Sequence, residues 1–370
     1  MSSLKHHIIA LIALLGTAAL SSSAAASLCG FNHYNSLSRE ERILNLQEVP
    51  LHIRNYRSDM RDVLLMLIRY AKEQKPDFKI VAHAGENLLT KSMWEYSRDG
   101  YNRARTAEGV SDDYFLFHDN YFDVEPLRDT AAWEYLNSLD AIAVNNLYCG
   151  ENVHLSAITS AHNLGLISIE QCASAQDLEQ AITSSIADKR SIYGFLDADE
   201  AFRTIGDYSL INDSAKNVYN VSDAQNILIL NDDSLYSSQE QLADDLSKTN
   251  YDIIVIKPLF NYHQRFSQAN LQKLHFKKNG SKRLLLAQFD VSEADPREYY
   301  WRQEWKTSLP DWAVRASFCN RFGIITRYWD NEWKKIISRY FKDVLNEGFD
   351  GVFFTGIENY RYFESQTPLE

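Results

Sequence analysis

Short runs of apolar and β-branched residues recur along the chain, and longer segments with helical spacing of apolar residues separate them. Most of the short runs are continuously apolar rather than alternating, which is typical of parallel strands covered on both faces. They predict strands at residues 79–84, 141–145, 166–169, 192–196, 227–231, 253–257, 284–291 and 351–355.

Several of the segments between these runs have apolar residues at the spacing of an α-helix. Residues 59–74 place their apolar side chains on one stripe, and the pattern ends just before Pro76. Further helices are predicted at residues 175–187, 238–247 and 331–346. Strands that alternate with helices in this way favour a single α/β domain with a (β/α)8 TIM barrel fold over an open sheet.

The order of the elements is unusual for a barrel. A TIM barrel normally begins with a strand and ends with a helix, whereas this chain begins with helix 59–74 and ends with strand 351–355. If the barrel closes, helix 59–74 must pack beside strand 351–355, and strand 351–355 must pair in parallel with strand 79–84. This order is expected of a circularly permuted barrel, which is tolerated where the termini lie close together.

The first residues resemble a targeting segment rather than part of the fold. Lys5 precedes an apolar run at residues 8–20, and Ala24 and Ala26 form a small-residue cleavage site. This pattern predicts a signal peptide at residues 1–26 and a secreted or periplasmic protein with residues 27–370 as one domain. The alternative is an uncleaved membrane anchor, but the run is shorter than the roughly 20 residues that cross a bilayer.

Composition limits the class of protein and of partner. The chain has 370 residues, of which 45% are hydrophobic and 24% are charged, so it can bury a core. A formal net charge of −12 argues against nucleic acid or an anionic membrane as a partner. The sequence predicts no stable membrane insertion after cleavage of the signal peptide, because no other segment is long and apolar enough.

Export would permit disulfides among the four cysteines, whose pairing has three possible connectivities. Cys149 and Cys172 both follow predicted strands that are neighbours and point the same way. We therefore expect their Cα atoms to lie within disulfide range, about 5.5–6 Å apart.

Several multi-residue motifs resemble a known family of barrel enzymes. The C-terminal third contains LAQFDVSEAD at residues 286–295 and YWDNEW at residues 328–333, and the N-terminal part contains GENLL at residues 85–89. Together with shorter matches, they resemble glycoside hydrolase family 114, and in particular the barrels typified by endo-α-1,4-polygalactosaminidase. The second half of the family pattern precedes the first half here. The resemblance implies a permuted glycosidase barrel that acts on partly deacetylated galactosamine polymers.

The resemblance also indicates where the active site should lie. Catalytic groups of such barrels lie at the C-terminal ends of the strands, and glycosidases generally use two carboxyl groups. Glu293 occupies the position of one family acid, but Lys257 stands where the resemblance places its partner. Other family acids and amides are also changed, and the residues found at those positions are Thr355, Asn145, Asn146, His83 and Ala84.

Acids at other strand ends could replace the missing carboxylate. We predict Glu293, Asp290 and Asp232 as catalytic residues, with Asp290 on the same strand as Glu293. The residues predicted to bind substrate are Lys257, Asp233, Glu170, Asp197, His83, Glu86, Asn145, Thr355, Glu358, Tyr300 and Trp329. The alternative for each acid is a capping or solvated role, and for Glu293 it is a structural carboxylate that caps a helix.

Lys257 has two interpretations. It could bind a sugar hydroxyl or an acidic group of the substrate, or it could be a salt-bridged lysine at the end of a strand. Beside Glu293 it should lower the pKa of that carboxyl group, which is the opposite of what a general acid needs near neutral pH.

Residues 90–130 form a long connection that is rich in Trp, Tyr and Phe. It is either a lid over the barrel mouth or a small satellite core packed on an outer helix.

The sequence contains no metal-binding motif, no Gly-rich phosphate loop and no Gly-x-Ser-x-Gly motif, so it predicts no metal and no cofactor.

Two functions therefore remain open. The first is an exported glycoside hydrolase that cleaves an α-linked, amino-sugar polysaccharide by carboxylate acid/base catalysis. The second is a catalytically degenerate barrel that binds polysaccharide as an accessory protein, and the replacements at Lys257, Thr355 and Asn145 favour it.

Overall fold

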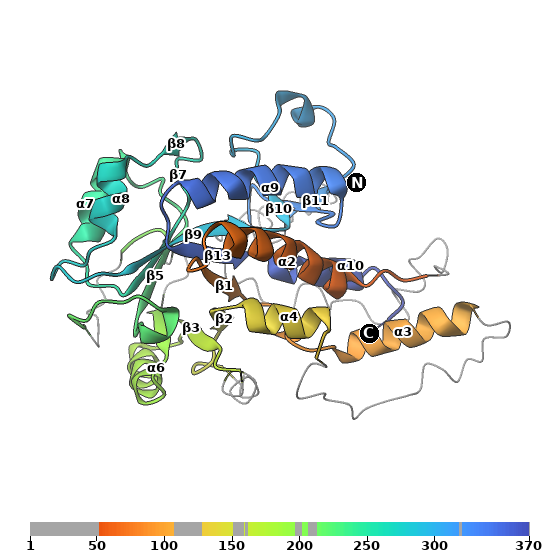
Figure 1. Cartoon of the computed structure of the whole chain (residues 1–370), viewed down its shortest axis with the longest axis horizontal. Coiled ribbons are helices and arrows are strands. Elements are labelled where there is room, and N and C mark those ends of the chain that lie inside the picture. The colour runs from red at the N-terminus through yellow and green to blue at the C-terminus, as the bar shows by residue number, and fades with distance from the viewer. Residues whose placement is uncertain are drawn as a thin grey trace, which may run out of the picture.

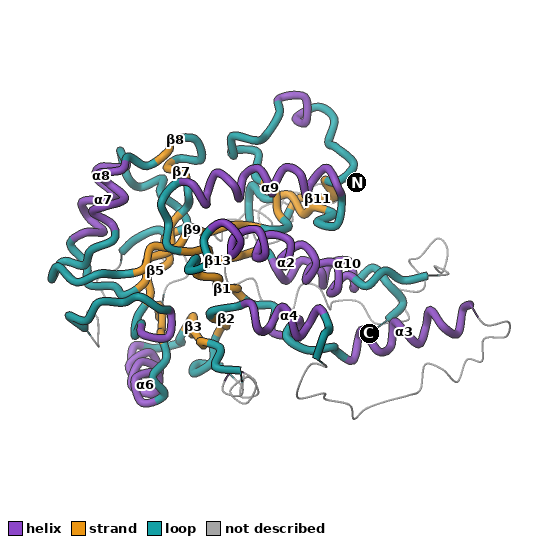
Figure 2. Tube along the Cα trace, viewed as in Figure 1, coloured by secondary structure: helices purple, strands orange, loops and turns teal. Residues whose placement is uncertain are grey.

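Eight parallel strands form one sheet in the order β4-β3-β2-β1-β13-β9-β6-β5 in the computed structural model (Figures 1 and 2). The structure describes residues 52–106, 128–150, 159, 162–196, 202–205, 213–317 and 320–369. The strands are β1 (Lys79–His83), β2 (Ala141–Asn145), β3 (Gly165–Gln171), β4 (Ser191–Phe195), β5 (Ile227–Leu230), β6 (Ile253–Ile256), β9 (Leu284–Asp290) and β13 (Gly351–Thr355). All eight predicted strands are confirmed, with ends that differ by at most a few residues.

The two edge strands of this sheet, β4 and β5, meet at a single bridge. Ile192 pairs in parallel with Asn226, and the Ser191 hydroxyl donates to the Ala224 carbonyl oxygen over 2.7 Å. The sheet is therefore a nearly closed barrel, and the protein has the (β/α)8 TIM-barrel-like fold that the sequence predicts. Its strands are almost entirely buried, which explains why their sequences are continuously apolar.

Helices surround this sheet. They are α2 (Tyr56–Gln74), α4 (Ala131–Ser138), α6 (Ala175–Ala187), α7 (Gln239–Ser247), α8 (Gln268–Leu274) and α9 (Asn331–Asn346). The four predicted helices are confirmed. Helix α2 begins three residues earlier than predicted, because the Asn55 side chain accepts a hydrogen bond from the Ser58 backbone and caps the helix there.

Helix α2 lies beside α4 and α9 in the helix layer (Figure 1). Strand β13 pairs in parallel with β1, with Lys79 opposite Gly351 and Ala82 opposite Phe354. The first helix of the described chain thus lies next to the helix that precedes the last barrel strand. The parallel pairing of the first and last strands, which the helix-first order requires, is confirmed.

Short strands follow β6 and β9 at their C-terminal ends. Strands β10 (Glu293–Ala294), β11 (Ala313–Ala316) and β12 (Ile324–Thr326) form a small antiparallel sheet after β9, and β7 (Leu259–Phe260) pairs with β8 (Gln264–Arg265) after β6. The remaining elements are the helix α10 (Tyr360–Glu364) and the 3-10 turns η3 (Glu86–Leu88), η5 (Val221–Asp223), η6 (Gln303–Lys306) and η7 (Ile357–Asn359).

The aromatic connection begins with the helix α3 (Met93–Thr106), which extends from one side of the barrel (Figure 1). Its Trp94 and Tyr101 are buried against Ile53 and Leu369 in a small cluster separate from the main core. The described part of this connection therefore forms a satellite core. Residues 107–127, on which the lid alternative depends, lie outside the described residues.

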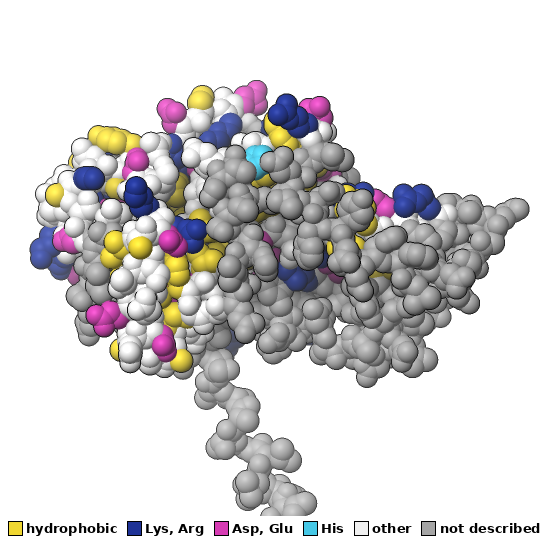
Figure 3. All heavy atoms as spheres, turned by 90° about the horizontal axis from the view of Figure 1, so that it is seen from below, with side chains coloured by type: hydrophobic (Ala, Val, Ile, Leu, Met, Phe, Trp, Pro, Cys, Tyr) yellow, Lys and Arg dark blue, Asp and Glu magenta, His cyan; other side chains and the backbone are white. Residues whose placement is uncertain are grey.

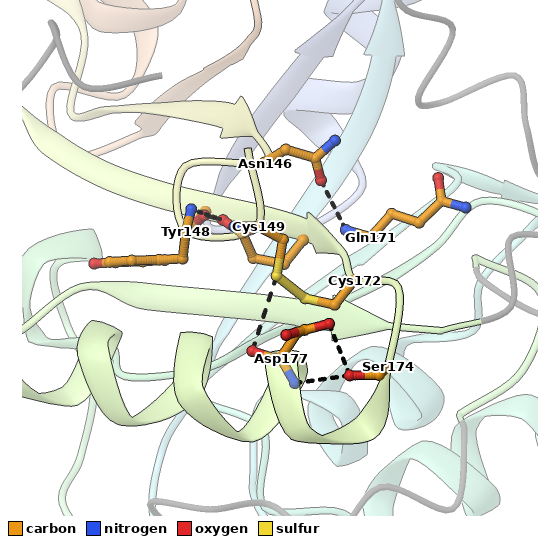
Figure 4. Close-up of a disulfide and its surroundings, with 9 residues drawn as sticks. Asn146, Tyr148, Cys149, Gln171, Cys172, Ser174 and Asp177 are labelled. Carbon is orange, nitrogen blue, oxygen red and sulfur yellow. Dashed lines mark hydrogen bonds between the residues drawn. A yellow bond between two sulfur atoms is a disulfide. The ribbon is translucent and has the colours of Figure 1, made fainter. Parts of the chain in front are cut away.

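A disulfide joins Cys149, in the loop after β2, to Cys172, just after β3 (Figure 4). The two Cα atoms are 5.4 Å apart, so the predicted pairing is confirmed. Cys29, Cys319 and the predicted signal peptide lie outside the described residues.

No helix in the described parts of the chain is long and apolar enough to cross a bilayer. On the face of the molecule shown in Figure 3, the described Lys and Arg side chains are interspersed with Asp and Glu side chains.

Candidate functional site

A small cavity of about 70 Å³ lies at the C-terminal ends of β6 and β9. It has room for about two water molecules, at roughly 30 Å³ each. It brings together three residues that the sequence singled out, Lys257, Asp290 and Glu293, and a fourth predicted residue, Tyr300. The other lining residues are Pro258, Tyr262, Gln288, Ala294, Asp295, Glu298, Asn320 and Tyr340.

Asp290 is the last residue of β9, and its carboxyl group is held by the backbone that follows it. Oδ1 accepts hydrogen bonds from the backbone N–H groups of Ser292 (3.1 Å) and Glu293 (2.7 Å), and Oδ2 accepts one from the Thr355 hydroxyl (3.3 Å). Burial, followed by the negative charge of Glu293, raises the pKa of Asp290 to about 8. Asp290 can therefore hold a proton at neutral pH.

Glu293 is the first residue of β10, so the prediction that it shares a strand with Asp290 is wrong. The chain leaves the barrel sheet after Asp290 and enters the small antiparallel sheet. There Glu293 Oε1 accepts hydrogen bonds from the Ser317 hydroxyl (2.7 Å) and the Asn359 amide (3.2 Å). These donors come from the connection after β11 and from η7, so two separate segments fix one carboxylate.

The expected lowering of the Glu293 pKa by Lys257 is also wrong. Burial raises the pKa of Glu293 and outweighs the hydrogen bonds from Ser317, Asn359 and Asn320, which lower it. The structure therefore gives Glu293 a pKa shift in the direction that a general acid needs.

Gly323 and Gly356 lie next to these carboxyl groups, and because glycine has no side chain, the carboxyl groups have room there. A Cβ atom at Gly323 would lie 2.5 Å from Glu293 Oε2, and one at Gly356 would lie 2.2 Å from Asp290 Oδ1. Gly356 also has a φ of 74°, which side-chain-bearing residues rarely adopt. Both acids therefore depend on glycines that lie on other segments of the chain.

Lys257 follows β6, and its Nζ lies 3.5 Å from the centre of the Tyr262 ring. Burial lowers the pKa of Lys257 to about 8, although the negative charge of Glu298 raises it. Among the described residues no carboxylate oxygen lies within 4.0 Å of this Nζ, so the salt-bridged alternative is wrong for this part of the chain.

Glu298 and Gln288 line the cavity but were not predicted from the sequence. Burial raises the pKa of Glu298 to about 7. Glu298 Oε2 and Gln288 Oε1 are both buried and have no hydrogen-bond partner among the described residues. Gln288 belongs to the LAQFDVSEAD motif but has no predicted role there, and Glu298 belongs to no recognisable motif, so only the fold shows that both line the cavity.

Asp232 and Asp233 follow β5 but do not line the cavity. Asp232 forms an ion pair with Arg203 over 3.1 Å, and Asp233 accepts a hydrogen bond from the Asn261 backbone over 2.7 Å. The structure thus gives Asp233 the loop-capping role that was the alternative to substrate binding. Asp290, rather than Asp232, is the predicted catalytic acid that lines the cavity together with Glu293.

A second group of predicted residues lies at the ends of β1, β2 and β13, apart from this cavity. His83 Nε2 is 3.0 Å from Asn145 Oδ1, and Glu358 accepts a hydrogen bond from the Gly85 backbone over 2.6 Å and pairs with Arg361. Burial, followed by the charge of Glu358, raises the pKa of Glu86 to about 7. His83, whose pKa is lowered by burial, stacks on Phe353.

Glu170 has a structural role rather than the predicted role in substrate binding. Its carboxylate accepts hydrogen bonds from the backbone of Tyr148 (3.0 Å) and Cys149 (2.8 Å) and from the Ser168 hydroxyl, and so holds the disulfide loop against β3. Potential ligand atoms of Glu170, Cys149 and Cys172 lie within 4.8 Å of one another. However, the disulfide uses both sulfur atoms, so these residues do not form a thiolate metal site.

Trp329 packs against Tyr56 and Phe363, with ring centres 5.3 and 4.6 Å away, and does not line the cavity. Arg54 lies over its ring at 5.0 Å. The structure therefore places Trp329 in the packing between α2 and α10 rather than at the carboxyl pair. Asp197 lies outside the described residues.

Larger hollows, of about 570 and 240 Å³, lie at the opposite end of the barrel. They are bordered by the residues at which strands begin, including Lys79, Leu284 and Ser191. Active sites of TIM barrels lie at the C-terminal ends of the strands. The smaller cavity, which contains the carboxyl pair, is therefore the better candidate site.

No protein-family model matches the chain. The chain is similar to an uncharacterised protein of Methanocaldococcus jannaschii, with 26% identity over 158 residues, or 40% of this chain and 44% of the relative. It is also similar to an uncharacterised protein of Thermotoga maritima, with 27% identity over 81 residues, or 22% of this chain and 25% of the relative. The chain spans less than half the length of either curated relative, and neither similarity brings an activity with it.

Proposed function

We propose that this protein is an exported glycoside hydrolase that cleaves an α-linked, amino-sugar polysaccharide of the polygalactosamine type. Its barrel would be a circularly permuted relative of glycoside hydrolase family 114, as the motif resemblance implies. Asp290 and Glu293 would supply the two carboxyl groups of the site, one as the general acid and the other as the base or nucleophile.

The observation that carries this proposal is the carboxyl pair at the barrel mouth. Asp290 and Glu293 lie within three residues of each other, line one cavity, and both have raised pKa values. Glycosidases need one carboxyl group that keeps its proton near neutral pH and a second carboxyl group close by. The pair supports acid/base chemistry even though Lys257 occupies the position of the family acid.

A second candidate function is that of a polysaccharide-binding accessory protein without activity. The size of the cavity favours it, because about 70 Å³ accommodates no more than a few atoms of a sugar ring. Cleavage would require the loops around Lys257 and Asn320 to open further when the polymer binds, whereas surface binding would not.

Incubation of the purified protein with partly deacetylated polygalactosamine tests both candidates. The first candidate predicts new reducing ends for the wild type, none for Glu293→Gln, and undiminished cleavage for the exposed control Glu304→Gln. Because glutamine is isosteric and can accept the bonds from Ser317 and Asn359, Glu293→Gln should leave thermal unfolding nearly unchanged. Retention of the wild type on the polymer without cleavage would favour the accessory protein. If the wild type neither cleaves the polymer nor is retained on it, this polysaccharide is not its ligand and both candidate functions are wrong.

A further inference from the structure

Two lysines of this barrel have their amino groups in the interior, and their surroundings differ. Lys277 Nζ is surrounded by acceptors, namely the Ser214 and Lys216 carbonyl oxygens at 2.7 and 2.8 Å and Asp252 Oδ1 at 2.7 Å. These acceptors satisfy a buried ammonium. Lys257 Nζ instead faces the Tyr262 ring and the cavity, and no described carboxylate lies within ion-pair distance. Its surroundings therefore suit a neutral amine better than those of Lys277 do.

Two other side chains that line the same cavity carry acceptors without donors. Gln288 Oε1 and Glu298 Oε2 are buried, line the cavity, and have no hydrogen-bond partner among the described residues. An unpaired buried acceptor destabilises the fold, so such atoms indicate a bound molecule that donates hydrogen bonds. Hydroxyl groups supply such donors.

The size and charge of the cavity limit the class of molecule that it can bind. A volume of about 70 Å³ matches a molecule of two or three carbon atoms rather than a whole sugar. Its acids are Asp290, Glu293, Asp295 and Glu298, and its lining includes one lysine. This excess of acids disfavours an anionic ligand such as a 2-oxo acid.

We propose that Lys257 is the nucleophile of a carbonyl-binding site, which condenses with a small neutral hydroxyaldehyde to form an imine. A desolvated lysine with access to a cavity is the arrangement that activates an amine for this reaction. The proposal goes beyond glycoside hydrolysis and does not depend on it.

The residues around Lys257 can move the protons that imine formation requires. The lone pair of the amine attacks the carbonyl carbon, and the carbonyl oxygen takes a proton from a cavity acid to give a carbinolamine. The nitrogen then loses a proton to a carboxylate, and a second proton from an acid lets the hydroxyl leave as water, which gives a protonated imine. The nitrogen of this species returns a proton to the carboxylate that supplied the second one, and the neutral imine remains. One aldehyde and one amine thus give one imine and one water, with no change in oxidation state.

Glu298 is best placed to act as the proton donor in these steps. It lines the cavity beside Lys257, and the two side chains influence each other's pKa values. With a pKa of about 7, its carboxyl group is partly protonated and partly ionised at neutral pH, so it can both donate and accept a proton. The Tyr340 hydroxyl, which also lines the cavity, favours the ionised form of this carboxyl group and lowers its pKa.

Reductive trapping tests the proposal on the full-length protein. Glycolaldehyde and sodium cyanoborohydride would be added at pH 7, and modified lysines would be located by peptide mass spectrometry. We expect a hydroxyethyl group on Lys257 at an aldehyde concentration at least tenfold below that which labels the exposed Lys306. Labelling of Lys306 and other exposed lysines with Lys257 unmodified would overturn the proposal.

Two variants separate the chemistry from a folding defect. Lys257→Met should abolish the selective label, and Lys306→Met should leave it intact. Glu298→Gln keeps the amine, so it should still be labelled at Lys257 but at least fivefold more slowly at pH 7. An unchanged labelling rate would exclude Glu298 as the proton donor. Because the trapping assay contains no polysaccharide, its failure would not affect the glycosidase proposal, and failure of cleavage would not affect this one.

Discussion

Arg57, in the first turn of α2, donates two hydrogen bonds to the carboxylate of Glu364, which lies 307 residues later in α10. The distances are 2.7 and 2.9 Å, and both side chains are about nine-tenths buried. The Arg57 guanidinium also lies 5.0 Å from the centre of the Tyr360 ring. This ion pair joins the first helix of the described chain to its last helix.

We expect Glu364→Gln to destabilise the fold by about 3–5 kcal/mol, because it leaves the Arg57 charge buried without its partner. Urea unfolding followed by circular dichroism would measure the change. Glu134→Gln is a matched control, because it breaks an exposed pair with Arg69 and should cost less than about 1 kcal/mol. Equal effects of the two variants would contradict the prediction.

Gly356→Ala should destabilise the protein more than Gly280→Ala does. Both glycines have a positive φ, 74° and 87°, so both substitutions carry the cost of a left-handed backbone. A Cβ atom at Gly280 meets no atom within 4 Å, whereas one at Gly356 lies 2.2 Å from Asp290 Oδ1. The difference in unfolding free energy should be about 1–3 kcal/mol. Similar stabilities would mean that Asp290 does not occupy the space beside Gly356.

The double variant Cys149→Ser, Cys172→Ser should lose about 3 kcal/mol of stability. The disulfide closes a loop of 23 residues and restricts the unfolded chain accordingly. Thermal unfolding of the variant and the wild type, both without reductant, would measure this loss. An unchanged midpoint would indicate that these two cysteines are not bonded in the protein.

Stability should fall as pH rises through about 7, and Glu86 should contribute to this fall. Its pKa is raised from 4.5 to about 7, so the folded state holds the proton more tightly than the unfolded chain. The resulting stabilisation is fully present below pH 4.5 and is lost as pH rises through 7. Glu86→Gln, which keeps a neutral side chain, should therefore be more stable than the wild type at pH 8, by on the order of 3 kcal/mol.

At pH 4.5 the same variant should differ little from the wild type, and this comparison is the control for the pH prediction. Denaturant titrations at both pH values would provide the two differences. Lower stability of Glu86→Gln than of the wild type at pH 8 would show that the ionised carboxylate is favoured in the fold.

The sequence predicted the barrel because buried parallel strands have a continuous apolar signature. Each of the eight strands has this signature, and helix α9 has both a capping aspartate, Asp330, and a clear apolar stripe. The small sheet of β10, β11 and β12 was missed, since its strands are short and lack the continuous apolar signature; β11, for example, contains Arg315 and is not buried. Glu293 was consequently assigned to the wrong strand.

The candidate site was predicted only in part, for a related reason. Strand ends identify Lys257 and Asp290, because every parallel strand points its last residues to the same edge. The donors that fix Glu293, Ser317 and Asn359, lie 24 and 66 residues away along the chain. Glu298 lies in an aromatic segment with no motif, so its proximity to Lys257 emerges only from the fold.

The barrel has one joint that differs from all others in the described sheet. Every other pair of neighbouring strands shares several residue pairs, whereas β4 and β5 touch at the single bridge between Ile192 and Asn226. The sheet is thus a ring that is held weakly at one joint, and this joint is where the barrel can deform most easily. A change in barrel circumference would therefore be taken up first at this joint, while β6 and β9, which end next to Lys257 and at Asp290, are held in register by four residue pairs.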